Sequence, residues 1–249
     1  MRPMRSALRV LVALVFSACF VGLQAQDFQR TYAIPSGGQI RIANISGDIR
    51  LTGYKGDSVM VSATKVGRDR DKVEVEDASS GNRVDLKVRY PENGNTDASV
   101  NFEVRIPQYV DFVFERIGSI SGDVEIADVR GQIKAASVSG DVLVRNVAGI
   151  VSAASVSGDV VVEMVRMEGR GEMKFNSVSG DVEVRAPANL DADVDMSTIS
   201  GSLKTDFPIE VQERRYGPGR SARGRLGAGA SSIKINSVSG RVSLLRTSS

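Results

Sequence analysis

The stretch SVSGDVLVRNVAGIVSAASVSGDVVV, residues 137–162, decides the fold. It contains the phrase S-x-S-G-D-V twice, and the two copies begin 18 residues apart. Close copies recur at 119–126 and 177–184, and looser ones at 44–51, 198–205 and 237–244. Self-similarity at a fixed period is typical of architectures in which one small unit stacks on the next.

Glycines mark the smaller period of this repeat, because they recur every nine residues at Gly122, Gly131, Gly140, Gly149 and Gly158. Around each glycine, apolar residues alternate with others, which is the pattern of a half-buried β-strand. This phase predicts that Val138, Gly140, Val142 and Val144 face inward, and likewise Val156 with Gly158. A Gly140→Val change is therefore expected to overpack the interior.

Nine is an odd number, so an uninterrupted strand would turn its apolar face outward in the next unit. The two spacer residues of each unit are therefore predicted corners, at 127–128, 136–137, 145–146, 154–155, 176–177 and 236–237. Ser, Asn and Asp suit corners because their side chains bond nearby backbone groups and tolerate left-handed conformations. Two units make one 18-residue coil, and the prediction is an all-β fold, a parallel β-solenoid of the β-helix or β-roll kind with two main faces.

The first 25 residues have the organisation of a secretory signal peptide. Arg2, Arg5 and Arg9 precede an apolar run at 10–22, and Ala25 ends a plausible cleavage site. An apolar run of this length is short for a membrane span of about 20 residues. We expect an unlipidated product that begins at Gln26 and has no transmembrane span, with lipidation of Cys19 as the alternative.

Residues 26–249 are predicted to form a single domain. Residues 26–115 form irregular coils, with a wider core around Phe102, Phe112 and Phe114. Residues 116–249 form the regular repeats, which a basic, glycine-rich loop at 206–231 interrupts. Because the repeat template is lost in this loop, we expect it to project from the stack without contributing to the core.

The composition argues against several classes of function. The chain has no histidine, which excludes Ser-His-Asp and Cys-His nucleophiles and the usual zinc sites. No phosphate-binding glycine loop occurs, so we predict neither enzyme activity nor a cofactor. Cleavage of the signal removes three arginines and leaves 29 basic against 30 acidic residues, which does not indicate nucleic-acid binding.

A row of aspartates is the first candidate site. Asp123, Asp141, Asp159 and Asp181 follow equivalent glycines, so they should stack about 4.8 Å apart along one edge. A bound cation would relieve their mutual repulsion. The alternative is that they are solvated turn carboxylates that accept hydrogen bonds from backbone amides, so that Asp141→Asn would cost little.

The second candidate is a cluster of arginines in the glycine-rich loop, formed by Arg214, Arg215, Arg220, Arg223 and Arg225. Guanidinium groups can bind phosphate or carboxylate in bidentate fashion. An anionic partner is therefore one interpretation of this cluster, and a disordered, solvated spacer is the other.

The repeated phrase, the I-x-I-x-N-x-x-G-D-I opening at 40–49 and the ending GAGASSIKINSVSGRVSL at 227–244 resemble one bacterial family. It is the putative-adhesin, β-strand-repeat family of unknown function. The resemblance implies an exported envelope protein with a β-solenoid fold and no established enzyme activity. We expect it in the periplasm, associated with the outer membrane or extracellular. The function expected is an adhesin-like binding module for an envelope glycan, an anionic lipid or a protein. The alternative is a structural or regulatory scaffold that acts by self-assembly or protein contact.

Overall fold

The computed structural model describes residues 27–91, 96–213 and 218–247. The signal segment 1–25 and two members of the arginine cluster, Arg214 and Arg215, lie outside the described residues. Within the described part the fold is all-β, as predicted, with one short 3-10 helix, η1, at Arg70–Lys72. No described helix is long and apolar enough to cross a membrane.

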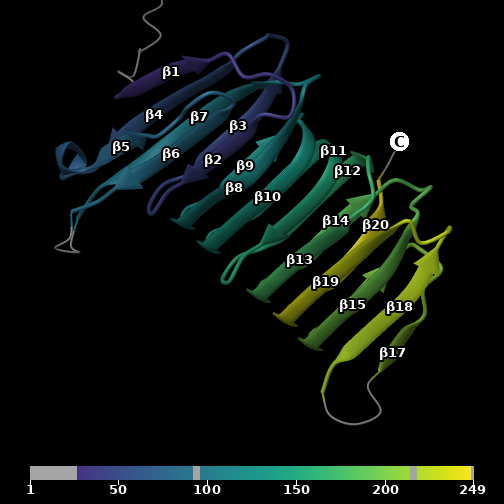
Figure 1. The fold of residues 1–249 in the computed structure, drawn as a ribbon. Coiled ribbons are helices and arrows are strands. Elements are labelled where there is room, and N and C mark those ends of the chain that lie inside the picture. The colour runs from purple at the N-terminus through teal and green to yellow at the C-terminus, as the bar shows by residue number, and fades with distance from the viewer. Residues whose placement is uncertain (1–26, 92–95, 214–217, 248–249) are drawn as a thin grey trace, which may run out of the picture.

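The strands form two faces of one elongated stack (Figure 1). The first half of the chain forms β1 (Phe28–Tyr32), β2 (Gln39–Ala43), β3 (Ile49–Tyr54), β4 (Val59–Val66), β5 (Glu74–Asp77), β6 (Arg83–Arg89), β7 (Ser99–Pro107), β8 (Asp111–Ser121) and β9 (Val124–Ala127). The second half forms β10 (Arg130–Ser139), β11 (Val142–Ala154), β12 (Val160–Arg166), β13 (Glu172–Ser179), β14 (Val182–Ala186), β15 (Ala192–Ser200), β16 (Leu203–Thr205), β17 (Val211–Glu213), β18 (Arg220–Leu226), β19 (Ser231–Ser239) and β20 (Val242–Arg246).

Each face is a ladder of paired strands. On the first face the order is β5, β6, β2, β8, β10, β11, β13, β19, β15, β18, β17. On the second it is β1, β4, β7, β3, β9, β11, β12, β14, β20, β16. Strand β11 contributes to both faces because it bends at Asn146, whose φ is 51°. A strand of the first face, the following strand of the second face and the corner between them are called a coil below.

The central coils repeat with the expected spacing. Val142 pairs in parallel with Val124 on one side and with Val160 on the other, an offset of 18 residues each way. Gly131 pairs with Gly149 at the same offset on the other face. Because equivalent strands pair at this constant offset, identical side chains form rows along the stack.

The order of coils in space differs from their order in the chain. The last coil, β19–β20, lies between β13–β14 and β15–β16. Near the other end, β2–β3 lies in the same way between β6–β7 and β8–β9. A charged contact joins the neighbouring strands β13 and β19. The Glu172 carboxylate of β13 accepts hydrogen bonds from Lys174 of its own strand and from Lys234 of β19, and these contacts lower the pKa of Glu172 to about 2.

Antiparallel strands close both ends of the stack, so the expectation of a purely parallel arrangement needs correction. At one end β4 runs antiparallel to both β1 and β7, and β5 runs antiparallel to β6. At the other end β18 runs antiparallel to both β15 and β17. Side chains alternate between the two faces of a strand whatever its direction. An antiparallel hairpin strand can therefore cover the last coil with its apolar face.

The interior is filled by branched aliphatic side chains and a few phenylalanines. Phe102, Phe112 and Phe114 of the N-terminal coils are fully buried. Phe112 and Phe114 meet edge to face, with ring centroids 6.3 Å apart. Phe175 is also fully buried, so the regular coils hold an aromatic ring as well.

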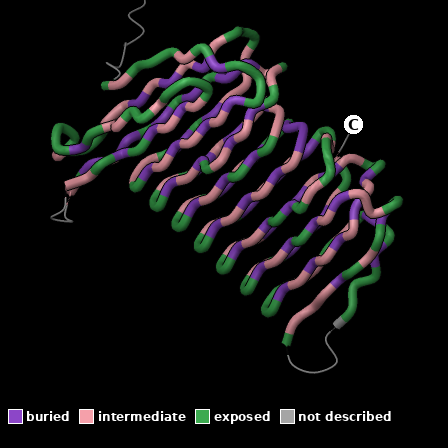
Figure 2. The backbone as a smooth tube through the Cα atoms, in the orientation of Figure 1, coloured by how far each residue is buried: buried purple, intermediate pink, exposed green. Residues whose placement is uncertain are grey.

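The predicted corners are right on one edge of the stack and wrong on the other. Asp128 and Asn146 have φ values of 60° and 51°, as left-handed corner residues do. The pair 136–137, in contrast, lies inside β10, and the chain leaves the strand only at Gly140. Ser137 is consequently buried and Val138 is exposed, the reverse of the predicted phase, and the corresponding residues of the other phrases follow the same pattern. Figure 2 shows these exposed corners as a row along one edge.

Candidate binding surfaces

The corner phrase S-x-S-G-D forms a hydrogen-bonded ladder that runs from coil to coil. The first serine is buried, and its hydroxyl donates to the glycine carbonyl of the neighbouring coil. Ser137 Oγ lies 2.9 Å from the Gly122 oxygen, and Ser155 Oγ lies 2.9 Å from the Gly140 oxygen. Ser119, Ser177 and Ser237 make the same contact. Each buried hydroxyl is thereby satisfied, as buried polar groups must be.

The aspartates form a second ladder beside the serines. Each carboxylate accepts the backbone N–H of the residue at the same position in the next coil. Asp141 Oδ1 lies 2.8 Å from the nitrogen of Asp159, and Asp123 Oδ1 lies 2.8 Å from that of Asp141. Asp48, Asp159 and Asp181 accept equivalent bonds. These contacts agree with the interpretation as turn carboxylates, and no group of His, Cys, Asp or Glu able to hold a metal occurs in the described residues.

The aspartate ladder predicts different results for two changes at one position. Asp141→Asn keeps a side-chain oxygen that can accept the Asp159 N–H, so the free energy of unfolding should change by less than about 0.5 kcal/mol. Asp141→Ala removes the acceptor and should cost about 1 kcal/mol. Urea unfolding followed by circular dichroism measures both values. A melting temperature that rises with millimolar calcium in the wild type but not in Asp141→Asn would instead support the cation row.

A row of exposed aliphatic side chains, which sequence reasoning missed, accompanies this edge. It comprises the middle residue of each phrase, and its members in spatial order are Ile45, Ile120, Val138, Val156, Val178, Val238 and Ile199. Each is between 41% and 48% exposed. Neighbours are joined by backbone hydrogen bonds, such as that from the Ser157 nitrogen to the Val138 oxygen at 2.8 Å. We call this row the aliphatic ridge.

The arginine cluster is part of the closed end of the stack, and the expectation of a projecting loop is wrong for its described residues. Arg220, Arg223 and Arg225 belong to β18, which pairs with β15 along seven residues. The stretch 206–231 contributes four buried apolar side chains, those of Phe207, Ile209, Ala222 and Leu226. An amphipathic hairpin can cover the last coil in this way because its apolar residues still alternate.

Two of the three described arginines of this cluster, Arg223 and Arg225, form ion pairs with aspartates of β15. Arg225 donates to both carboxylate oxygens of Asp193, at 2.6 and 3.0 Å, and this lowers the pKa of Asp193. Arg223 lies 3.0 Å from an oxygen of Asp195. Arg220 donates to the Gly201 carbonyl at 3.4 Å. The aspartates that Arg223 and Arg225 contact lie about 30 positions earlier in the sequence, so no local sequence pattern indicates the pairing.

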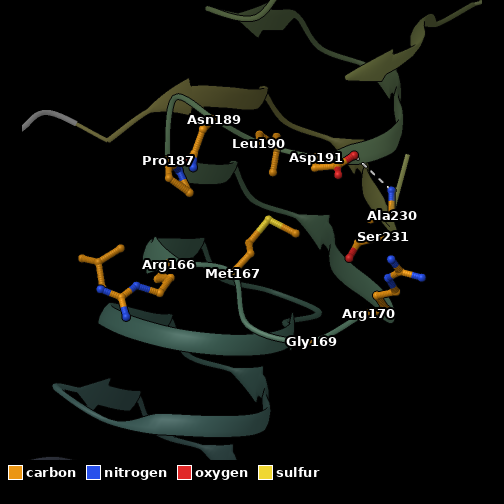
Figure 3. Close-up of a pocket in the computed structure, with 11 residues that line it drawn as sticks. Arg166, Met167, Gly169, Arg170, Pro187, Asn189, Leu190, Asp191, Ala230 and Ser231 are labelled. Carbon is orange, nitrogen blue, oxygen red and sulfur yellow. Dashed lines mark hydrogen bonds between the residues drawn. The ribbon is translucent and has the colours of Figure 1, made fainter. Parts of the chain in front are cut away.

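A cleft lies on the edge opposite the S-x-S-G-D corners (Figure 3). Its volume is about 490 Å³. It forms where three connections meet, namely those from β12 to β13, β14 to β15 and β18 to β19. They meet because β19 is inserted between β13 and β15. The lining residues are Val165, Arg166, Met167, Gly169, Arg170, Pro187, Asn189, Leu190, Asp191, Ala230 and Ser231.

The cleft combines an apolar interior with a basic rim. Met167 packs against the core and Leu190 is buried. Figure 3 shows the Met167 side chain at the centre of the cleft, with Arg166 and Arg170 on opposite sides. Asp191 accepts hydrogen bonds from the nitrogens of Gly229 and Ala230 at 2.7 and 3.1 Å. These backbone amides, chiefly that of Ala230, lower the pKa of Asp191. Through the same hydrogen bonds Asp191 holds the turn between β18 and β19.

The cleft could in part have been anticipated from the sequence, because four extra residues interrupt the nine-residue glycine period between Gly158 and Gly171. An insertion into a repeat forms a loop on the surface. The meeting of that loop with 187–191 and 227–230 depends on the order of coils in space, which local patterns do not contain.

Comparison with known proteins gives a matching family and similar solved structures. No curated protein matches this chain. A putative cell adhesion protein from Clostridium sporogenes is 11% identical, with a TM-score of 0.39 over 88% of this chain and 99% of its own. A putative adhesin from Bacteroides fragilis is 16% identical, with a TM-score of 0.40 over 88% of this chain and 96% of its own.

The family is established by the repeat region itself. The model of the Toastrack DUF4097 family matches residues 113–245, which begin in β8 and end in β20. This confirms the resemblance to a putative-adhesin, β-strand-repeat family of unknown function. Because the match covers more than half of the chain, this protein belongs to the Toastrack DUF4097 family.

Proposed function

We propose that this protein is an exported, non-catalytic binding module of the cell envelope, adhesin-like, built as a solenoid that presents its lateral surface to a ligand. Export rests on the signal pattern of residues 1–25. The ligand class that fits best is an acidic envelope glycan. An anionic lipid and a protein are the other partners to be tested.

The observation that supports this proposal is the closure of both ends of the stack. Of the four terminal strands, β16 and β17 have three residues each, β5 reads Glu-Val-Glu-Asp, and β1 has five residues with Arg30 at its centre. Short and like-charged edge strands discourage pairing with another chain. End-to-end growth into a scaffold is therefore disfavoured, and contacts with other molecules fall on the lateral surface.

The cleft is one part of that surface with the properties of a ligand site. Its volume lies within the range of roughly 300–1,000 Å³ that is usual for small-molecule sites. Arg166 and Arg170 supply two guanidinium groups, of which that of Arg166 also lies 3.3 Å from the Glu168 carboxylate. The Asp191 carboxylate of the lining accepts hydrogen bonds from backbone amides. A sugar acid offers a carboxylate for an arginine and a ring face for Met167 and Leu190.

Binding of oligogalacturonate to the chain from residue 26 onward tests the proposal. Exchanging Arg166 and Arg170 for serine should weaken binding about tenfold or more, since charge-assisted hydrogen bonds contribute about 1.5–3 kcal/mol. The matched control is Arg145→Ser, an exposed corner arginine outside the cleft. Calorimetry at two salt concentrations should show weaker binding at the higher one.

Three results would count against this assignment. Equal affinity of the double variant and the wild type would remove the cleft from the binding site. Binding to phosphatidylglycerol vesicles but not to the oligosaccharide would change the ligand class to anionic lipid. Binding to neither would favour the structural or regulatory scaffold that acts through protein contacts.

A further inference from the structure

The aliphatic ridge is not required by the fold of one chain. Its side chains point away from the core, which is filled by their neighbours such as Ala135 and Val142. Threonine would satisfy the same strand geometry with a polar side chain. Seven coils nevertheless carry valine or isoleucine at this position, and they include seven of the eleven exposed large hydrophobic residues of the described chain.

The ridge belongs to a wider band that carries no charge. Two residues before each ridge residue, on the same side of the strand, lies a small or uncharged side chain. In spatial order these are Ala43, Gly118, Ala136, Ala154, Asn176, Asn236 and Ser197. The last three are joined by hydrogen bonds, from Asn236 to Asn176 at 3.1 Å and from Ser197 to Asn236 at 2.8 Å. Most of these side chains are smaller than the valines and isoleucines of the ridge, so we call this row the trough.

Charges flank the band with opposite signs on its two sides. Four residues before the ridge lie Arg41, Arg116, Lys134 and Lys174 in four of the coils. Three residues after the ridge, in the same four coils, lie Asp48, Asp123, Asp141 and Asp181. Three coils depart from this pattern, with Ser152 and Asp159 around Val156, Lys234 and Arg241 around Val238, and Asp195 and Ser202 around Ile199.

We propose that a second copy of this chain packs on the aliphatic ridge, related by a two-fold axis that is parallel to the stack. This axis places the ridge of each copy in the trough of the other, coil against equivalent coil. It also places the basic side of each band against the aspartate side of the other, for example Lys134 opposite Asp141. A two-fold axis along the strands would instead bring like charges together.

A second copy fits this surface better than another protein does, because its rungs have the same spacing. Seven rungs about 4.8 Å apart give a band about 29 Å long, and the five steps from Lys134 to Ser139 give a width of about 17 Å. The two copies together would bury roughly 1,000–1,400 Å², at the lower end of the range for specific interfaces. We therefore expect a reversible dimer with a Kd in the micromolar range.

Sedimentation velocity of the chain from residue 26 onward, over 1–200 µM, tests the dimer. The wild type should shift from monomer to dimer over this range. Val156→Arg, at the centre of the ridge, should stay monomeric, because its dimerisation constant should fall at least 100-fold. The matched control is Val66→Arg, since Val66 is 47% exposed but lies away from the ridge. A monomeric wild type at 200 µM, or dimerisation of Val156→Arg, would overturn the proposal. Melting temperatures confirm that both variants are folded.

Disulfide trapping tests the register. Without the signal segment the chain has no cysteine, because Cys19 is the only one in the sequence. The proposed axis brings residue 138 of one copy opposite residue 136 of the other. An equimolar mixture of Ala136→Cys and Val138→Cys should form the disulfide-linked heterodimer at least tenfold faster than either variant links to itself. Faster self-linking of Val138→Cys would contradict this packing.

Discussion

Replacing Gly140 by alanine is expected to destabilise the protein by about 3 kcal/mol, at the upper end of the usual cost of overpacking. A Cβ at this position would lie 2.3 Å from the carbonyl oxygen of Gly122, which is backbone and cannot move aside. The same oxygen accepts the hydroxyl of Ser137, so a shift of the coil would also break that bond. Equilibrium unfolding in urea measures the loss.

The matched control for this prediction is Ser139→Ala. Ser139 is exposed and lies one residue from Gly140, and a smaller side chain there should leave the free energy of unfolding within about 0.5 kcal/mol of the wild type. Equal stability of Gly140→Ala and Ser139→Ala would mean that the coils do not approach as closely as the structure has them. Because Gly158, Gly180 and Gly240 stack on their neighbours in the same way, each should repeat the result.

This close stacking gives the glycines of the repeated phrase a physical reason that differs from the one the sequence pattern suggests. The alternation of apolar residues places glycine on the inward phase, whereas Gly140 lies at the turn and contacts backbone of the adjacent coil. Ile133 and Ala135 are buried, so strict alternation along β10 makes Ser137 the next inward residue and Val138 an outward one. The first serine of the phrase reads as polar, yet it is buried because its hydroxyl has a fixed acceptor.

The order of coils could not be predicted, for a different physical reason. The repeated phrase places every coil in an equivalent environment, so the ladder of serines and aspartates can form between any two of them. Ser177 pairs with Ser237, 60 residues away, as readily as Ser137 pairs with Ser119. The choice of neighbour depends on the connections and the closed ends, whose pairing of Arg225 with Asp193 is long-range.

Removal of the last coil is expected to abolish cooperative folding, although it lies at the end of the chain. A chain that stops at residue 230 lacks β19 and β20, which pair with β13, β14, β15 and β16 on both sides. It also lacks the fully buried side chains of Ile233, Ile235, Val242 and Leu244. Burial of four such side chains contributes about 6–12 kcal/mol, comparable to the whole stability of a domain, about 5–15 kcal/mol.

The contrast with an ordinary repeat protein makes this prediction sharp. Where coils follow one another in sequence order, loss of the terminal coil only shortens the stack, and the remainder still unfolds cooperatively. Here the truncation opens a gap inside the stack and leaves the β15–β18 end without a partner. Far-UV circular dichroism during urea titration distinguishes the two, with a chain that stops at Thr247 as the control. A cooperative transition of the truncated chain, at the midpoint of that control, would mean that β15 docks directly on β13 and that coils in this fold are interchangeable.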